Sequence, residues 1–307
     1  MALQIQESVS ISPGRRTLQS GLNDESALRR GIYTLTRSKT ATAGAFIIIV
    51  LLILLAIGPE IAPYDPTVQD LMARHQGPSA GHWLGTDNLG RDILSRILHG
   101  ARLSLSLSFG AVGFALVLGI PIGLVSGYLG GLVDTIVVSL VDILLTLPTY
   151  LLAIFIVAIT GPSLFNILLA VGIATLPTIV RVVRGDTLSM KNWEVTVAAR
   201  CIGAGSPRIL FRHILPNLLS TVAVVATIQL GGAILVEASL SFLGLGLSPP
   251  TPSWGLMINE GLRFLGNNPR VAVMPGIAIM LTVLGFNLFG DGLRDALDPR
   301  LRGRKEG

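Results

Sequence analysis

Charged residues are scarce in this chain of 307 residues, where Asp, Glu, Lys and Arg together make up 13% of the sequence. Soluble domains carry about 25% charged residues, so the scarcity argues against a water-soluble protein. Lysine occurs only at Lys39, Lys191 and Lys305, and no G-x-x-x-x-G-K-[ST] stretch is present. The chain therefore lacks the phosphate-binding loop by which many ATPases hold ATP.

Cysteine and clustered histidine are also missing. Cys201 is the only cysteine, which excludes an internal disulfide. The histidines are scattered and form neither an H-E-x-x-H motif nor a Cys/His cluster: His75, His82, His99 and His213. No Ser or Cys nucleophile motif is present either. We therefore expect no metal site, no catalytic residue and no cofactor in this chain.

Long apolar runs dominate what is present. Half of the residues are hydrophobic, and the mean hydropathy is +0.68. A transmembrane helix needs about 20 mostly apolar residues, which predicts an all-α membrane protein with six transmembrane helices. The six runs are Ala41–Ile61, Leu103–Tyr128, Leu132–Ile159, Leu164–Val183, Leu218–Leu240 and Val271–Phe289.

The basic residues are unevenly distributed around these runs. Of the 23 Lys and Arg residues, 17 lie in the N-terminal tail, at the end of the fourth run and in the loop after it, or in the C-terminal tail. Cytoplasmic loops carry such an excess, so we expect both termini in the cytoplasm. The net charge of +5 then reflects membrane orientation rather than nucleic-acid binding.

These patterns predict four segments along the chain. Residues 1–40 form a cytoplasmic tail, 41–100 the first span and an outer loop, 101–293 the membrane core, and 294–307 a second cytoplasmic tail. Within the core, residues 194–216 form a cytoplasmic loop. No cleavable signal precedes the first apolar run, so we expect that run to be an uncleaved anchor.

The cytoplasmic stretch Val197–Asn217 has a pattern of its own. Small and apolar residues recur at helical spacing up to Ile202, and Gly203, Gly205 and Pro207 then interrupt the helix. A second apolar stripe follows and leads into the fifth run. The stretch is expected to be either an interfacial helix lying on lipid or a docking helix for a cytoplasmic partner.

This stretch resembles the "EAA…G…I-LP" loop of ABC-importer permeases, and Arg212–Asn217 resembles the peptide-importer branch. Two residues depart from the pattern: Val197 stands where Glu is usual and His213 where Ile is usual. The resemblance implies a type I ABC importer permease fold with a coupling helix seated in a groove of an ATPase subunit. Ala199 and Gly203 are expected to face that groove. The coupling residues implied are Val197, Ala198, Ala199, Gly203, Ala204, Arg208, His213, Leu215 and Pro216.

The first outer loop, residues 62–100, closes with the motif Leu84–Asp92. Asp87 is expected to cap a helix, with Asp87/Arg91 and Asp92/Arg96 as i,i+4 ion pairs on it. The helix either lies at the membrane interface with one face in water or is a segment particular to the family that the motif resembles. The motif resembles the N-terminal segment of oligopeptide- and dipeptide-importer permeases.

The second outer loop carries a predicted short amphipathic helix over Trp254–Leu265. A tryptophan there is typical of a membrane-interface anchor. The run Ser241–Gly246, the following Pro-Pro-x-Pro-x-Trp-Gly and the end Gly290–Pro299 resemble the same family, so that the resemblance covers residues 37–301. It implies periplasmic docking residues, which are Asp87, Arg91, Asp92 and Trp254.

Acidic residues inside the runs are candidates for a translocation pathway, because a charge in lipid needs a partner or water. Asp142 lies mid-run, six residues before Pro148, and Glu237 lies near the outer end of the fifth run. Asp142 either lines the passage or bonds one helix to another; its residue type is compatible with both.

Two function classes follow. The resemblance implies the permease subunit of a bacterial inner-membrane, binding-protein-dependent importer for di- or oligopeptides, or for glutathione, opines or nickel complexes. Its partners would be a second homologous permease, two ATPase subunits that hold ATP and Mg²⁺, a periplasmic binding protein and membrane lipid. The alternative is an ion-gradient-driven carrier, which would show inverted repeats and paired midplane acids; neither pattern is visible in the sequence.

Overall fold

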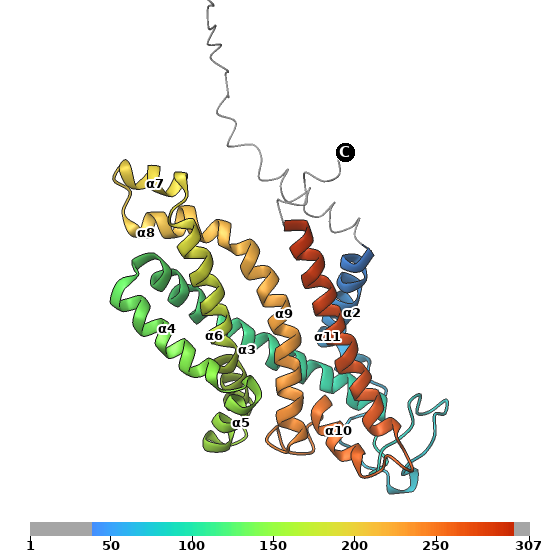
Figure 1. Ribbon diagram of the computed structural model, residues 1–307. Coiled ribbons are helices and arrows are strands. Elements are labelled where there is room, and N and C mark those ends of the chain that lie inside the picture. The colour runs from blue at the N-terminus through green and yellow to red at the C-terminus, as the bar shows by residue number, and fades with distance from the viewer. Residues whose placement is uncertain (1–38, 298–307) are drawn as a thin grey trace, which may run out of the picture.

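The computed structural model describes residues 39–297, and within that range the secondary structure is helical (Figure 1). The predicted tails, 1–40 and 294–307, fall largely outside it. The elements are α2 (Lys39–Ile61), η1 (Leu71–Ala73), α3 (Ile93–Leu129), α4 (Gly131–Thr146), α5 (Thr149–Thr160), α6 (Leu164–Met190), α7 (Glu194–Cys201), α8 (Ser206–Ile209), η2 (Leu210–Ile214), α9 (Leu215–Phe242), α10 (Trp254–Leu262) and α11 (Arg270–Leu297).

Five of the described helices are long and apolar enough to cross a membrane, counting α8 to α9 as one, and the bent pair α4–α5 makes a sixth candidate span. The predicted all-α membrane architecture is confirmed over residues 39–297. The second span is longer than predicted, because the helix expected in the outer loop and the apolar run form one helix of 37 residues. No proline separates the two parts, and the isolated Gly100 between them is tolerated inside the helix.

The third apolar run is not one straight span, contrary to the prediction. Its two halves, α4 and α5, meet at 90°. Leu147 has an extended backbone, with φ −88° and ψ 131°, because the ring of Pro148 disfavours helical geometry in the residue before it. Pro148 therefore divides the run into two short helices.

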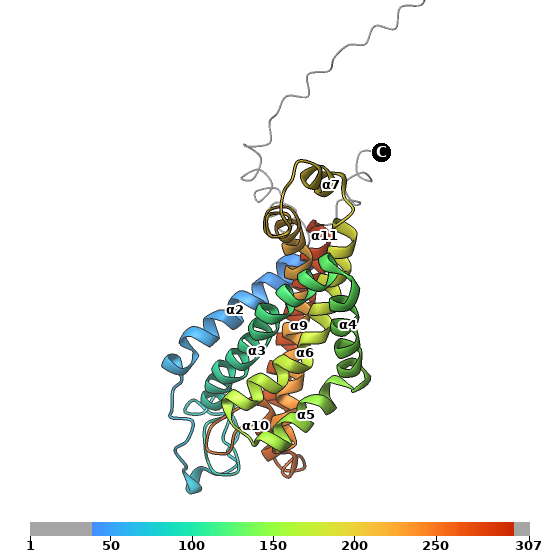
Figure 2. The ribbon, with the colours of Figure 1, turned by 90° about the vertical axis from the view of Figure 1, so that its left-hand side faces the viewer.

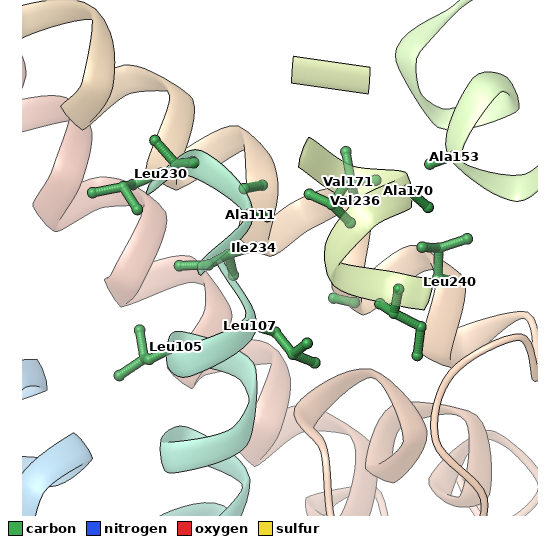
Figure 3. Close-up of a cluster of buried hydrophobic side chains, with 14 of the residues drawn as sticks. Leu105, Leu107, Ala111, Ala153, Ala170, Val171, Leu230, Ile234, Val236 and Leu240 are labelled. Atoms are coloured by element: carbon green, nitrogen blue, oxygen red, sulfur yellow. The ribbon is translucent and has the colours of Figure 1, made fainter. Parts of the chain in front are cut away.

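The helices form an elongated bundle whose two ends differ (Figures 1 and 2). The segment from α7 to η2 lies at one end, and α10 with the outer loop lies at the other. α3 crosses the bundle obliquely and packs against α6, while α11 lies between α2 and α9. Buried side chains from α3, α5, α6 and α9 fill the centre (Figure 3).

α2 and α11 approach each other through small residues. A Cβ atom added to Gly44 would lie 2.5 Å from the backbone nitrogen of Phe289, and one on Gly285 would lie 2.5 Å from Cγ2 of Ile47. Close backbone approach at glycine is a common means of packing helices in lipid. The hydrophobic effect does not drive helices together there, because the lipid tails are as apolar as the side chains. The first span is thereby fixed to the last one.

Gly44→Val should therefore separate α2 from α11. Overpacking a closely packed contact costs about 1–3 kcal/mol, and here the obstacle is backbone, which cannot rotate away. The variant should show a lower midpoint of heat-induced aggregation in detergent. Gly276→Val is the matched control, since it places the same side chain in α11 where no atom lies within 4 Å of the new Cβ. Equal midpoints for the two variants would contradict this packing.

Candidate functional site

The loop that is predicted to be cytoplasmic is an ordered helix–turn–helix, as the sequence predicts. α7 ends in a Schellman motif, in which Gly203 N–H donates to Arg200 O and Ala204 N–H to Ala199 O, both at 3.0 Å. Gly203 has φ +83°, a conformation that residues with a Cβ resist. The glycine thus turns the chain sharply from α7 into α8.

Ala199 is largely buried within the described chain, and its contact with an ATPase groove stays a prediction. Its side chain is only 6% exposed and packs inward in a cluster that includes Ile209, Ile214 and Leu218. Smallness at Ala199 serves packing of α7 onto the chain's own second helix. Gly203 is exposed, as expected.

The outward face of this loop is apolar. Ile202 is 87% exposed, Phe211 66% and Val195 64%. Ile202 and Val195 lie outside the candidate spans, and Phe211 lies near the start of the candidate span Ser206–Phe242. Sequence reasoning missed Val195 and Phe211 as site residues, and the available signal was their spacing beside Ile202. An open groove is lined by Val195, Ala198, Ala199, Ile202, Ala204, Arg208, Arg212 and His213. Among the other predicted coupling residues, Val197 is exposed, and Leu215 and Pro216 begin α9.

A single aromatic residue connects this loop to the membrane helices. Tyr128, at the end of α3, is buried in the same cluster as Ala199. The Lys191 ammonium lies 5.7 Å and the Arg200 guanidinium 5.9 Å from its ring centroid, within the range of cation–π attraction. α3, α6 and α7 therefore meet at one ring, a contact that no sequence pattern indicates.

Two ion pairs lie along the contact between α4 and α6, which we call the α4–α6 seam (Asp134, Asp142, Arg181 and Arg184). Arg184 donates to both carboxylate oxygens of Asp134, at 2.5 and 2.6 Å, and Ser126 donates to Asp134 at 2.6 Å. Arg181 donates to Asp142 at 2.5 Å. The arginines were not predicted as site residues, because the sequence does not reveal that α4 and α6 lie side by side.

Glu237 is buried between helices in the described part of the chain. Its side chain is buried, and Ser241, one turn later on α9, donates a hydrogen bond of 2.8 Å to it. Its second carboxyl oxygen and the Ser104 hydroxyl of α3 are both buried without a hydrogen-bond partner. Glu237 therefore lies within the helix packing in this conformation, and its place in a pathway stays a prediction.

A buried charge network holds the outer end together. Asp87 accepts from Arg91 Nε at 2.7 Å and from Arg96 Nη1 at 2.6 Å. Glu260 of α10 accepts from Arg91 at 2.9 Å and Arg96 at 2.8 Å. Two carboxylates thus compensate two guanidinium groups, which makes their burial tolerable. Glu260 was not predicted.

Two details of the sequence-based interpretation need correction here. Asp92, not Asp87, caps α3, because its carboxylate accepts from Ser95 N–H at 2.8 Å. Asp87 instead stays in the preceding loop, where it accepts from Leu89 N–H at 2.8 Å. The expected Asp92/Arg96 ion pair is absent from the described contacts, since Arg96 turns towards Asp87 and Glu260.

Trp254 is not a membrane-interface anchor, contrary to the expectation for such a residue. It is 1% exposed, lies against Gly100 and donates from Nε1 to Ile97 O at 3.1 Å. Asp87, Arg91 and Asp92 are also buried. The four residues predicted for periplasmic docking therefore hold the outer elements in place, and contact with a binding protein stays a prediction.

The chain matches two family models. Residues 119–303 match the binding-protein-dependent transport system inner membrane component, and residues 26–78 match the N-terminal transmembrane domain of oligopeptide transport permease C. The dipeptide transport system permease protein DppC of Alkalihalophilus pseudofirmus is 44% identical over 89% of this chain and 90% of its own length. The glutathione transport system permease protein GsiD of Pectobacterium atrosepticum is 44% identical over 87% and 89%.

The fold also matches a solved structure, the inward-facing MetNI methionine ABC transporter. The TM-score is 0.55 at 20% identity, over 66% of this chain and 96% of the other. At that identity the likeness supports the fold alone, which is the type I ABC importer permease fold. With the family models and the relatives, it means that the chain is a multi-pass inner-membrane protein and belongs to the ABC-importer permeases of the oligopeptide and dipeptide branch.

Proposed function

We propose that this permease subunit forms half of the translocation pathway of an importer for di- or oligopeptides. The observation that carries the substrate class is the 44% identity to a dipeptide permease along nine-tenths of both chains. Glutathione is the second candidate, because relatives of the same similarity are glutathione permeases. Glutathione is itself a small zwitterionic peptide, so both candidates belong to one chemical class.

The partners proposed are a second homologous permease, two ATPase subunits that bind ATP and Mg²⁺, and a periplasmic binding protein. The exposed apolar face of α7 and η2 supports the ATPase contact, because Ile202, Val195 and Phe211 are costly to leave in water. α4 supports the second permease, since one residue of this helix, Val141, is buried within the described chain.

In this proposal, closure of the ATPases moves α7, and the motion reaches the membrane helices through packed contacts. Tyr128 joins α7 to the end of α3, and Ala199 joins it to η2. α9 continues from η2 without a break. A displaced α7 therefore tilts α3 and α9 together, which alternates access between the two ends of the bundle.

Both termini lie in the cytoplasm in this proposal. The uneven distribution of basic residues supports that orientation. So does the fold, because α2 begins and α11 ends at the same end of the bundle as α7 (Figure 1). The outer loop and α10 then face the periplasm.

Peptide uptake tests the proposed substrate class. The complete complex, purified with its co-expressed partners and placed in liposomes with ATP inside, should accumulate a labelled dipeptide when loaded binding protein is outside. Omission of ATP should abolish uptake. Accumulation of glutathione alone would select the second candidate, and ATP-independent uptake driven by an ion gradient would contradict the importer mechanism.

Topology is tested by fusing a reporter that is active only in the periplasm. Fusions after Met72, which is 93% exposed, and after Gly266, beyond α10, should be active. A fusion after Lys191 should be inactive, because that residue begins the cytoplasmic loop. Activity at Lys191 would place α7 away from any ATPase and contradict the proposed coupling.

Ile202→Asp should weaken ATPase binding. A carboxylate at this exposed apolar position would need to lose its hydration on docking, which costs several kcal/mol if it stays unpaired. Folding should be unaffected, because Ile202 makes no buried contact of its own. The measurement is the amount of ATPase that co-purifies and its stimulation by loaded binding protein. Asn192→Asp, an exposed position just before α7, adds the same charge and should leave both unchanged; equal losses in the two variants would contradict docking on Ile202.

A further inference from the structure

The ion pair between Asp142 and Arg181 lies at an unusual depth. Asp142 is about 16 Å along α4 from Gly131, at 1.5 Å per residue, within a helix pair long and apolar enough to span the membrane. Yet the side chains of Asp142 and Arg181 are 55% and 58% exposed. Hydrocarbon cannot cover two exposed charged groups cheaply, so this face of α4 and α6 lies against water, substrate or protein.

A purely structural role is already filled by the neighbouring pair. Asp134 and Arg184 join α4 to α6 through two hydrogen bonds, Ser126 adds a third, and the two charged side chains are only 19% and 28% exposed. Asp142 and Arg181 share a single hydrogen bond. Exposed pairs of this kind contribute little to stability and open readily, so the second pair is available for another purpose.

We propose that Asp142 and Arg181 bind the charged ends of a peptide in transit. Asp142 receives the α-ammonium and Arg181 the α-carboxylate, and the two side chains pair with each other again when the peptide has passed. The inference rests on the proposed function and adds the site at which the peptide is held. An arginine suits this role because its planar guanidinium can donate two hydrogen bonds to one carboxylate.

Charge balance favours this exchange. A zwitterionic peptide brings one positive and one negative group, so opening the protein pair leaves neither side chain without a partner of opposite charge. An extended peptide of two or three residues spans about 7–10 Å, which two neighbouring side chains on adjacent helices can bracket once they separate. A blocked peptide, with one charge removed, would leave one side chain without a partner.

The first experiment uses the complete complex in liposomes, with Cys201→Ser to remove the only native cysteine. In that background Asp142→Cys should lower dipeptide uptake about tenfold, the effect of losing one charge-assisted hydrogen bond. Attachment of an anionic methanethiosulfonate should restore most of the uptake, and attachment of a cationic one should not. Leu140→Cys, an exposed position on the same helix, keeps the ion pair and should transport like the parent before labelling.

A second variant distinguishes loss of peptide binding from a folding defect. Asp142→Asn combined with Arg181→Gln removes both charges together, so no unpaired charge is left to impede assembly. This complex should co-purify with its partners but should lose uptake about tenfold, and it should no longer prefer a free dipeptide over its N-acetylated or amidated forms.

Three results would overturn the inference alone. The first is normal uptake by the double variant, with its preference for a free dipeptide over the blocked forms unchanged. The second is failure of both reagents to label Asp142→Cys, with or without ATP, in a complex whose parent takes up peptide. Equal restoration by the two reagents would do the same, since it would show that size rather than charge matters. Absence of peptide uptake by the parent complex would instead overturn the proposed function, and the inference with it.

Discussion

The cost of charge in a medium of low dielectric is the constraint on which this structure depends. An unpaired Asp, Lys or Arg at the centre of a transmembrane helix costs about 2.5–3.5 kcal/mol. The deepest charges on α4 and α6 are accordingly joined to each other across the two helices. The same rule holds at the outer end, where two buried arginines are balanced by the buried Asp87 and by Glu260, which is 18% exposed. Each of these arginines binds a carboxylate that another element carries.

Small residues bring those elements close enough. Gly44 and Gly285 allow the first and last spans to touch, and Gly100 gives room for Trp254 to lie on α3. Ala199 acts in the same way at the opposite end of the bundle, where a larger side chain would push α7 away from η2. Packed interiors tolerate added volume poorly, so the small residues at these positions determine how closely the neighbouring helices pack against one another.

The sequence predicts most of the fold and less of the site. Apolar run length identifies five spans and the run that divides into α4 and α5. The residues around Gly203 predict the helix–turn–helix from α7 to η2. What it does not reveal is long-range partnership: Arg181 for Asp142, Arg184 for Asp134, Glu260 for Arg96. Such pairs depend on which helices lie side by side, and no local pattern encodes that. The misplaced cap has the same origin, because Asp87 and Asp92 are equally good caps by residue type, and the distant arginines decide between them.

Two helices connect the cytoplasmic loop to the outer elements. α3 is about 55 Å long, at 1.5 Å per residue; Tyr128 near one end contacts Arg200 of α7, and Arg96 near the other end binds Glu260 of α10. α9 makes a similar connection. At one end it continues from η2, and at the other end its Phe242 carbonyl accepts a hydrogen bond of 2.6 Å from Asn259 of α10. Because both helices are fixed at both ends by specific contacts, a rigid tilt of either one moves α7 and α10 together. The exposed pair on α4 and α6 lies between these ends, on helices joined to α3, so a tilt of α3 alters the surroundings of Asp142 and Arg181. The arrangement therefore links the position of the α7–η2 segment to an ion pair inside the candidate spans whose two side chains are more than half exposed.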